Sequence, residues 1–299
     1  MPELPDITLY IEALNAHISS QPLERIRLAS PFLVRTVDPP IFEAEGKQIR
    51  ALHRIGKRVV WEFENDLYLV FHLMVAGRFH WKKRGVKPPG KIGLAAFDFS
   101  TGTLLLTEAS TKKRASLHVM RGKESLKQFD RGGLEIFGAT LNDFRLQLSK
   151  ENHTLKRSLT DPTLFSGIGN TYSDEILHRA KLSPLKLSSK LSDEEASRLF
   201  DAARMTLNEW TERLREQLRG EFPEKVTAFH PEMAVHGKFG KPCPVCGTTV
   251  QRIVYAENEC NYCPRCQTGG KLLADRSLSR LLKGDWPRSI DEMEATHKQ

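Results

Sequence analysis

Apolar residues in the first part of the chain follow two different periods. Near the N-terminus they lie three or four positions apart, as on one face of a helix, and this predicts a helix that begins near Pro5. The residues on that face are Ile7, Ile11, Leu14 and Ile18. Shorter apolar runs separated by turn residues then predict strands at 57–64, 67–73, 94–99 and 103–107. Strands joined by such closely spaced hairpins predict a sandwich or a barrel-like sheet.

The second half of the chain has the period of helices. The pattern predicts helices at 141–148, 154–160, 171–180, 192–218 and 272–282. Ser192 and Glu195 have the spacing of a capping box at the start of the fourth of these helices. Its apolar stripe is expected to lie in the core and consists of Ala196, Leu199, Ala203, Leu207, Trp210 and Leu214. The change of period at Gly132 and Gly133 predicts a domain boundary.

All five cysteines lie in one short segment near the C-terminus. Two Cys-Pro-x-Cys knuckles are separated by sixteen residues, and they comprise Cys243, Cys246, Cys263 and Cys266. Such knuckles suit a tetrahedral zinc ion, and four protein ligands leave no open position, so the predicted site is structural. Cys260 is left over as a spare thiol, although a ligand set that includes it stays open at this point. A strand at 250–256 and a turn at 257–259 complete a predicted zinc ribbon.

The overall charge favours a polyanionic partner. The chain has 299 residues, with 45 Lys and Arg against 37 Asp and Glu, for a net charge of +8. Such a surplus is compatible with nucleic acid but does not establish it. The apolar runs are far shorter than the ~20 residues of a membrane helix, and the acidic N-terminus carries no signal core. We therefore expect a cytoplasmic protein without a membrane partner.

A glycine-rich turn lies between two predicted helices. Gly167-Ile168-Gly169-Asn170 matches neither a P-loop nor a dinucleotide fingerprint. The turn would aim backbone N–H groups of a helix start outward, with Asn170 as an added donor, and this suits a phosphate. The alternative is an ordinary glycine-rich corner between helices.

The N-terminal residues offer a second chemistry. If Met1 is removed, Pro2 presents a secondary amine whose ordinary pKa is near ~8, well below that of lysine. Such an amine can attack the anomeric carbon of a sugar and form an iminium, and Glu3 beside it can supply a proton. The alternative is an ordinary chain terminus without catalytic meaning.

These features occur in an order that resembles a known family. They are Pro2-Glu3-Leu4-Pro5-Asp6, the Gly56-Lys57 hairpin, the Gly-Ile-Gly-Asn turn and the four-cysteine ribbon. Together they resemble the formamidopyrimidine-DNA glycosylase and endonuclease VIII (Fpg/Nei) family of base-excision repair enzymes, from residue 2 to about residue 267. The resemblance implies an α+β multidomain fold. Residues 1–132 would form an N-terminal helix plus β-sandwich, 133–228 a helix–two-turn–helix domain and 229–270 a zinc ribbon, with 271–299 as a C-terminal extension.

The resemblance also implies roles for individual residues. Pro2 would be the Schiff-base nucleophile and Glu3 the general acid, while Lys57 would contact phosphate and assist elimination. Asn170 would bind the phosphates that flank an extruded nucleotide, with Lys156 close by. Further DNA contacts would come from Glu175 in the lesion pocket and from Met74, Val75, Lys113, Arg114, Lys238 and Asn258.

Three positions depart from the family pattern. Val75 stands where the family has a wedge methionine, and Met74 beside it would point the opposite way along a strand. The segment around Lys113 and Arg114 replaces Arg-Arg-Phe and lacks the aromatic wedge. Asn258 replaces the arginine of the zinc hairpin, so a charge-assisted phosphate contact is lost, for which Lys238 or Arg252 could compensate.

We therefore expect a bifunctional DNA glycosylase and AP lyase that holds one structural zinc ion. Its partner would be double-stranded DNA with a damaged or abasic site, and the enzyme would act as a monomer on the bacterial nucleoid. The alternative is a non-catalytic zinc-ribbon protein that binds damaged or distorted DNA. The sequence leaves open the lesion, the opposite base and the choice between β- and β,δ-elimination. A hydrolase or catalytic metalloenzyme is disfavoured because Gly-x-Ser-x-Gly and His-Glu-x-x-His are absent from the sequence.

Overall fold

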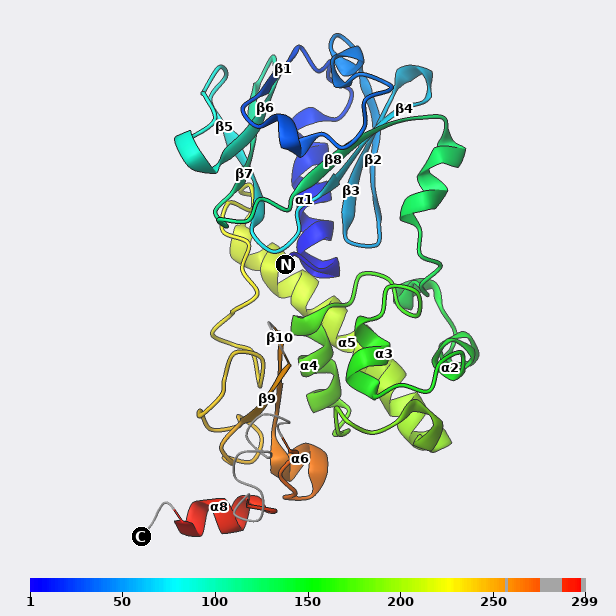
Figure 1. Cartoon of the computed structure of the whole chain (residues 1–299), viewed down its shortest axis with the longest axis vertical. Coiled ribbons are helices and arrows are strands. Elements are labelled where there is room, and N and C mark those ends of the chain that lie inside the picture. The colour runs from blue at the N-terminus through cyan, green and yellow to red at the C-terminus, as the bar shows by residue number, and fades with distance from the viewer. Residues whose placement is uncertain (256–257, 275–286, 297–299) are drawn as a thin grey trace. The chain divides into compact units, whose positions relative to one another are not determined.

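The computed structural model describes residues 1–255, 258–274 and 287–296, which form two compact units (Figure 1). The first unit comprises Met1–Arg131 and Glu209–Ala228, and the second comprises Gly132–Asn208 and Phe229–Gln299. No helix within the described ranges is long and apolar enough to cross a membrane.

The first unit contains helix α1 (Leu4–Ile18) and two four-stranded antiparallel sheets. One sheet has the order β1 (Arg25–Leu28), β6 (Gly93–Phe99), β7 (Gly102–Glu108) and β5 (Gly77–Lys82). The other has the order β2 (Ile49–Ile55), β3 (Arg58–Phe63), β4 (Leu67–His72) and β8 (Ser116–Arg121). The predicted N-terminal helix and the hairpin-rich sheets are confirmed. Short 3-10 helices lie at Pro31–Leu33, Ile41–Ala44, Glu64–Asp66, Gly90–Ile92 and Lys123–Phe129.

Aromatic side chains join the two sheets and α1 into one core. The ring of Trp61 in β3 lies 4.7 Å from that of Phe71 in β4 and 5.3 Å from that of Phe97 in the opposite sheet. Tyr10 of α1 packs edge-on against Phe79 of β5, with ring centroids 5.4 Å apart. All five side chains are fully buried. Burial of such large rings dominates core energetics, so these contacts fix α1 and the strand ends that carry the site.

The second unit consists of helices followed by a small hairpin. Its elements are η6 (Ile136–Gly138), α2 (Leu141–Ser149), α3 (Leu155–Thr160), α4 (Asn170–Arg179), η7 (Ser188–Lys190), α5 (Asp193–Leu218), β9 (Gln251–Tyr255), β10 (Asn258–Tyr262), α6 (Pro264–Thr268) and α8 (Ile290–Thr296). Helix α5 continues from this unit into the first. The predicted helices up to residue 218 are confirmed. The helix predicted at 272–282 lies largely outside the described residues.

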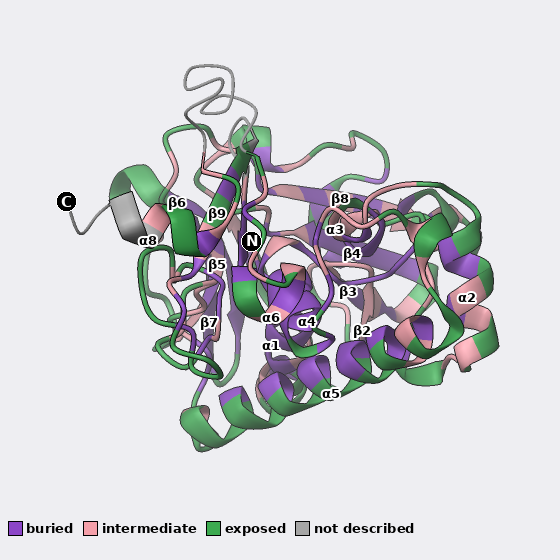
Figure 2. Cartoon of the chain, turned by 90° about the horizontal axis from the view of Figure 1, so that it is seen from below, coloured by how far each residue is buried: buried purple, intermediate pink, exposed green. Residues whose placement is uncertain are grey.

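The sequence of α5 caps its N-terminus and gives the helix one apolar side. The Ser192 hydroxyl accepts the N–H of Glu195 at 3.2 Å, and a Glu195 carboxylate oxygen accepts the N–H of Ser192 at 2.9 Å. The predicted capping box is therefore present. The predicted apolar stripe is buried in full, while the opposite side of the helix is exposed (Figure 2).

Two local predictions need correction. The turn predicted at 257–259 is shorter, because Asn258 and Glu259 already belong to β10 and pair with Tyr255 and Val254. The antiparallel register continues to the hairpin end, and residues 256–257 lie outside the described part of the chain. Lys57, predicted as a strand residue, lies in the two-residue turn between β2 and β3.

Candidate active site and metal centre

The chain terminus is held at the start of α1. Pro2 is buried, and the side chain of Glu3 is almost inaccessible, with 2% of the residue exposed. The backbone N–H of Glu3 donates to Oδ2 of Asp6 at 2.8 Å. This bond closes the first turn of the helix, because Asp6 accepts an N–H group that has no partner within the helix. The residues that precede α1 therefore have a defined position.

Four charged groups act on the terminal amine, which in this structure is that of Met1. Burial lowers the pKa of the amine, and Arg78 and Lys57 lower it further, while Glu3 and Asp6 act in the opposite direction. The net effect is a lowered pKa. The neutral, nucleophilic form of an amine is therefore favoured at this position.

Asp6 titrates in an unusual range for a carboxyl group. Burial raises its pKa to about 7, although the hydrogen bond from the Glu3 backbone opposes the rise. A group with this pKa can hold or release a proton near neutral pH beside the terminus. The sequence pattern gave Asp6 no role, because only the folded chain shows that it is buried.

A neutral histidine accompanies the predicted Lys57. His72 ends β4 and pairs with Arg58, the residue that follows Lys57. Burial, together with the positive charges of Arg58 and Lys57 and the neighbouring His118, lowers the pKa of His72 to about 4. The imidazole is therefore uncharged at neutral pH and can donate or accept a hydrogen bond. The sequence pattern did not single out His72, although it precedes the Met74 segment.

The expected wedge residues lie in a turn. Met74 adopts the left-handed conformation with φ of 53°, and Val75 is 60% exposed. Both lie between β4 and β5, so the expectation that Met74 faces the opposite way along a strand is wrong. Of the two, Val75 has the exposure that a residue contacting DNA requires.

A buried carboxylate shapes the predicted Lys113–Arg114 contact segment. Glu108 is 1% exposed at the end of β7, and its oxygens accept the N–H groups of Arg114 and Ala115 at 2.9–3.0 Å. The Lys113 ammonium donates to the backbone carbonyl of Glu108. The segment is thus folded around Glu108, which the sequence pattern did not reveal because the acid precedes the segment by several residues.

In the second unit, Lys156 and Asn170 lie together as predicted. The Lys156 ammonium donates to the Asn170 carbonyl at 2.7 Å, to Ser173 Oγ at 2.8 Å and to Asp174 Oδ1 at 2.6 Å. All three of its protons are therefore used within the protein. Asn170 Nδ2 donates to the Glu259 carbonyl of β10 at 2.8 Å, and this leaves one amide proton for another acceptor. In this structure Lys156 positions the turn and does not present its charge to solvent.

Glu175 also has a structural role, because its carboxylate binds the backbone of another segment. Its two carboxylate oxygens accept the backbone N–H groups of Ala234, Val235 and His236, each at 2.9 Å. The residue is 7% exposed. Glu175 therefore anchors the segment that leads into the ribbon. Its proposed place in a lesion pocket has no support from these contacts.

Lys238 and Asn258 are the predicted DNA contacts in and near the zinc ribbon. Lys238 donates to the Pro231 carbonyl at 2.8 Å and lines a surface hollow of about 700 Å³ formed by residues within 229–244. The backbone of Asn258 opens β10, but its side chain lies outside the described part of the structure.

The four predicted metal ligands converge. The Sγ atoms of Cys243, Cys246, Cys263 and Cys266 all lie within 4.8 Å of one another. The Cys243–Cys266 and Cys246–Cys263 separations are 3.9 and 3.4 Å. Four thiolates about 2.3 Å from a tetrahedral zinc ion would be about 3.8 Å apart, so the cluster fits zinc.

Two further residues, His178 and Cys260, stand in different relations to this metal centre. Nε2 of the buried His178 lies 3.3 Å from the Cys243 sulfur. Cys260 does not belong to the cluster; it is buried, and burial together with the Asp174 charge raises the pKa of its thiol. The ligand set that includes Cys260 is therefore wrong.

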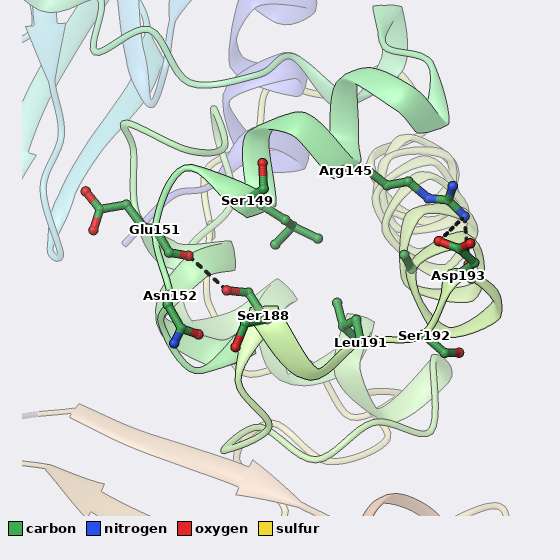
Figure 3. Close-up of a pocket in the computed structure, with 11 residues that line it drawn as sticks. Arg145, Ser149, Glu151, Asn152, Ser188, Leu191, Ser192 and Asp193 are labelled. Carbon is green, nitrogen blue, oxygen red and sulfur yellow. Dashed lines mark hydrogen bonds and ion pairs between the residues drawn. The ribbon is translucent and has the colours of Figure 1, made fainter.

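A separate pocket of about 270 Å³ lies between α2, η7 and the start of α5 (Figure 3). The Arg145–Asp193 ion pair at 3.2 Å and a hydrogen bond of 2.8 Å from Ser188 Oγ to the Glu151 carbonyl lie along its wall. None of the predicted site residues lines this pocket. The pocket is therefore separate from the groups assigned to the chain terminus, the phosphate turn and the metal centre.

Comparison with known proteins identifies the architecture. Residues 1–115 match the formamidopyrimidine-DNA glycosylase N-terminal domain, 137–219 the formamidopyrimidine-DNA glycosylase H2TH domain, and 240–269 a zinc finger found in FPG and IleRS. The fold and the thiol cluster thus define a protein that joins a glycosylase-type N-terminal domain to an H2TH domain and a zinc finger. The zinc-finger match covers the four-thiol cluster, so the chain holds one structural zinc ion.

Two related bacterial proteins align with large parts of the chain. The formamidopyrimidine-DNA glycosylase of Heliobacterium modesticaldum is 31% identical over an alignment of 278 residues that covers 89% of this chain and 100% of that protein. An uncharacterised formamidopyrimidine-DNA glycosylase-like protein of Mycobacterium tuberculosis is 41% identical over 155 residues, 50% of this chain and 94% of that one. The chain belongs to the formamidopyrimidine-DNA glycosylase family.

The similar solved structures are complexes with DNA, as two of them illustrate. MutM in complex with DNA containing carbocyclic 8-oxo-G matches with a TM-score of 0.79 and 27% identity, covering 89% of this chain and 100% of that chain. Lactococcus lactis Fpg in complex with DNA containing an abasic site matches with a TM-score of 0.78 and 26% identity, covering 89% and 99%.

Replacing Asp6 by Asn tests the buried carboxyl group. Because its pKa is raised to about 7, the folded state binds more protons than the unfolded state between about pH 4 and 7. The contribution of Asp6 to stability is therefore present at low pH and lost as the pH rises through 7. Asp6→Asn should gain stability over the wild type from pH 4.5 to pH 8, by up to about 3 kcal/mol. Thermal melting at both pH values measures this; an equal difference at both would contradict the assignment.

Replacing Cys263 by Ser tests the metal centre. A hydroxyl is a poor zinc ligand, so bound zinc should fall from about one equivalent to near none, and the ribbon should lose its fold. Cys260→Ser is the matched control, because this thiol lies outside the cluster, and it should retain the metal. Zinc stoichiometry by atomic emission distinguishes the two. Full zinc content in Cys263→Ser would exclude the four-cysteine site.

Proposed function

We propose that this chain is a bifunctional DNA glycosylase and AP lyase of base-excision repair, which removes a damaged base through a Schiff base at Pro2. The observation that carries the proposal is the terminus itself. Pro2 is buried beside Glu3 at the start of α1, and burial together with Arg78 and Lys57 lowers the pKa of the terminal amine, which belongs to Met1 until its removal exposes Pro2. Family membership supports the same reaction, since its similar structures contain 8-oxo-G or abasic-site DNA.

The first half of the reaction breaks the glycosidic bond. Removal of Met1 exposes the Pro2 amine, whose lone pair attacks C1′ of the damaged nucleotide. The C1′–N bond breaks and the base leaves with that electron pair, taking a proton that Glu3 supplies. Loss of the amine proton and opening of the sugar ring then give an iminium at C1′. An extruded nucleotide is required, because an enzyme cannot reach C1′ inside the stacked duplex.

The second half nicks the strand. The iminium acidifies C2′; removal of a C2′ proton expels the 3′ phosphate in β-elimination, and a further elimination expels the 5′ phosphate. Lys57 is assigned to the phosphate that leaves. Water finally hydrolyses the iminium and returns the free Pro2 amine. Zinc takes no part in these steps, because four protein ligands close its coordination sphere.

The second unit is assigned to phosphate binding. The remaining amide proton of Asn170 and the backbone N–H groups at the start of α4 are the donors, while Lys156 fixes their position. Val75, Lys113, Arg114, Lys238 and Asn258 are assigned as further DNA contacts.

We assign the domains to residues 1–132, 133–228, 229–270 and 271–299. We also propose that the lesion is an oxidised base. The enzyme would act as a monomer on DNA in the cytoplasm.

A blocked N-terminus tests the nucleophile. An N-terminal tag that stays attached keeps Pro2 in an amide bond, so borohydride should trap no adduct on DNA with an abasic site. Pro2→Gly keeps an amine but loses the ring that orients it, and trapping should fall at least about 10-fold. Both variants should bind this DNA within about threefold of the wild type, since phosphate contacts carry the affinity. A wild-type protein that binds but forms no adduct would instead be a non-catalytic DNA-binding protein.

Replacing Asn170 by Ala tests the phosphate contact. Loss of one hydrogen bond to a charged group should weaken DNA binding about 10-fold, equally for unrelated sequences, because the contact is to the backbone. Asn152→Ala, in the same unit but outside the turn, is the matched control and should bind as the wild type does. Fluorescence anisotropy on several duplexes measures both. Sequence-selective loss, or loss of zinc in Asn170→Ala, would contradict a direct phosphate contact.

A further inference from the structure

Helix α4 faces the zinc ribbon with a row of polar side chains four residues apart. Asn170, Asp174 and His178 have this spacing, which places them one above another on one side of a helix. Asn170 Nδ2 donates to the Glu259 carbonyl at 2.8 Å, and an Asp174 carboxylate oxygen accepts the N–H of Asn261 at 3.1 Å. Both of these partners belong to β10. The first two members of the row therefore attach α4 to the hairpin of the ribbon.

His178, the third member of the row, reaches the thiol cluster. Its Nε2 lies 3.3 Å from the Sγ atom of Cys243, and both residues are buried. Gln267 makes a second contact at this end of the helix. Its Nε2 donates to the Leu182 carbonyl at 2.9 Å, and its Oε1 accepts the N–H of Cys263 at 2.8 Å. Both cysteine knuckles are therefore in contact with the end of α4 or the residues that follow it.

The chemistry of a zinc-bound sulfur decides which group donates at the His178 contact. A cysteine that ligates zinc is a thiolate, which has no proton and can only accept. A hydrogen bond to Cys243 therefore requires the imidazole proton on Nε2 in the zinc-loaded protein. Four thiolates bring two negative charges more than a zinc ion neutralises, so a buried donor stabilises the cluster. The N–H of Cys266 is such a donor for the Cys263 sulfur, at 3.5 Å.

We propose that His178 is a positioning residue for the zinc site: its Nε2–H donates to the Cys243 thiolate, and this bond makes the end of α4 part of the metal centre. The bond spreads the excess negative charge of the cluster and fixes the direction of the sulfur, and both effects slow the loss of the metal. Asn170 begins the same helix, about 12 Å away along its axis. The zinc centre thereby supports the helix that carries the proposed phosphate turn. The inference concerns metal retention and does not require the proposed Schiff-base reaction.

The test compares two replacements of His178 in the zinc-loaded full chain. His178→Phe keeps a ring of similar size but has no donor at the position of Nε2, whereas His178→Gln keeps an N–H donor of similar reach. His153→Gln is the matched control, because His153 lies in the same unit, pairs with Glu151 and is outside the thiol cluster. The first measurement is the rate of zinc transfer to a chromogenic pyridylazo chelator at one fixed pH. The second is the position of the thiolate-to-metal charge-transfer bands after cobalt substitution.

His178→Phe should release zinc at least about 10-fold faster than the wild type, and its cobalt charge-transfer bands should shift, because the hydrogen bond to the sulfur is lost. His178→Gln should release zinc within about threefold of the wild-type rate, since an amide donor replaces the imidazole donor. His153→Gln should behave as the wild type does. Wild-type release with unshifted bands in His178→Phe would overturn the proposal. Equal acceleration in both His178 variants with unshifted bands would also overturn it, because that pattern indicates packing alone.

The wild type provides a test that stands even if His178→Phe does not fold. Long-range proton–nitrogen NMR spectra of the zinc-loaded protein identify which ring nitrogen of His178 carries the proton. We expect a protonated Nε2. A protonated Nδ1 together with a bare Nε2 would overturn the proposal, whatever the variants show.

Discussion

A single buried carboxylate holds the second unit together. Asp174 of α4 is almost inaccessible, and its oxygens bind Lys156 at 2.6 Å, His236 at 2.8 Å and the N–H of Asn261 at 3.1 Å. Burial opposes ionisation, but Lys156 and His236 hold the pKa of Asp174 below its ordinary value. Removal of one partner from such a pair costs about 3–5 kcal/mol. Asp174 thus ties together the residue that positions the proposed phosphate turn, the segment that leads into the ribbon, and β10 of the ribbon.

In the first unit, burial changes the pKa values of ionisable groups. At the start of α1, few water molecules reach the terminus or Asp6, so ionic forms are disfavoured and nearby charges act strongly. The lowered pKa of the terminal amine and the pKa of about 7 of Asp6 follow from the same cause. The zinc ribbon needs no such tuning, because its four thiols serve a closed structural site.

Much of the fold could be predicted because its signals are local. The spacing of the cysteines, the Ser192 capping box and the apolar stripe of α5 each lie within one short stretch of sequence. Pro2, Glu3 and Asn170 could be identified as candidate site residues for the same reason, because each lies in a short motif. The contacts of Glu175 could not be predicted: its carboxylate accepts three backbone N–H groups some sixty residues away, and no local pattern shows such a contact.

The sequence by itself determined the helices up to residue 218, several of the strands and the metal ligands, because hydrophobic periodicity and ligand spacing depend on residues close together in the chain. Only the tertiary structure decided the protonation of the site and the use of its charges. It buried Asp6, partly buried His72 and directed Lys156 inward to Asp174. Solvation and Coulomb interactions depend on distance in space, and separation along the chain does not reveal that distance.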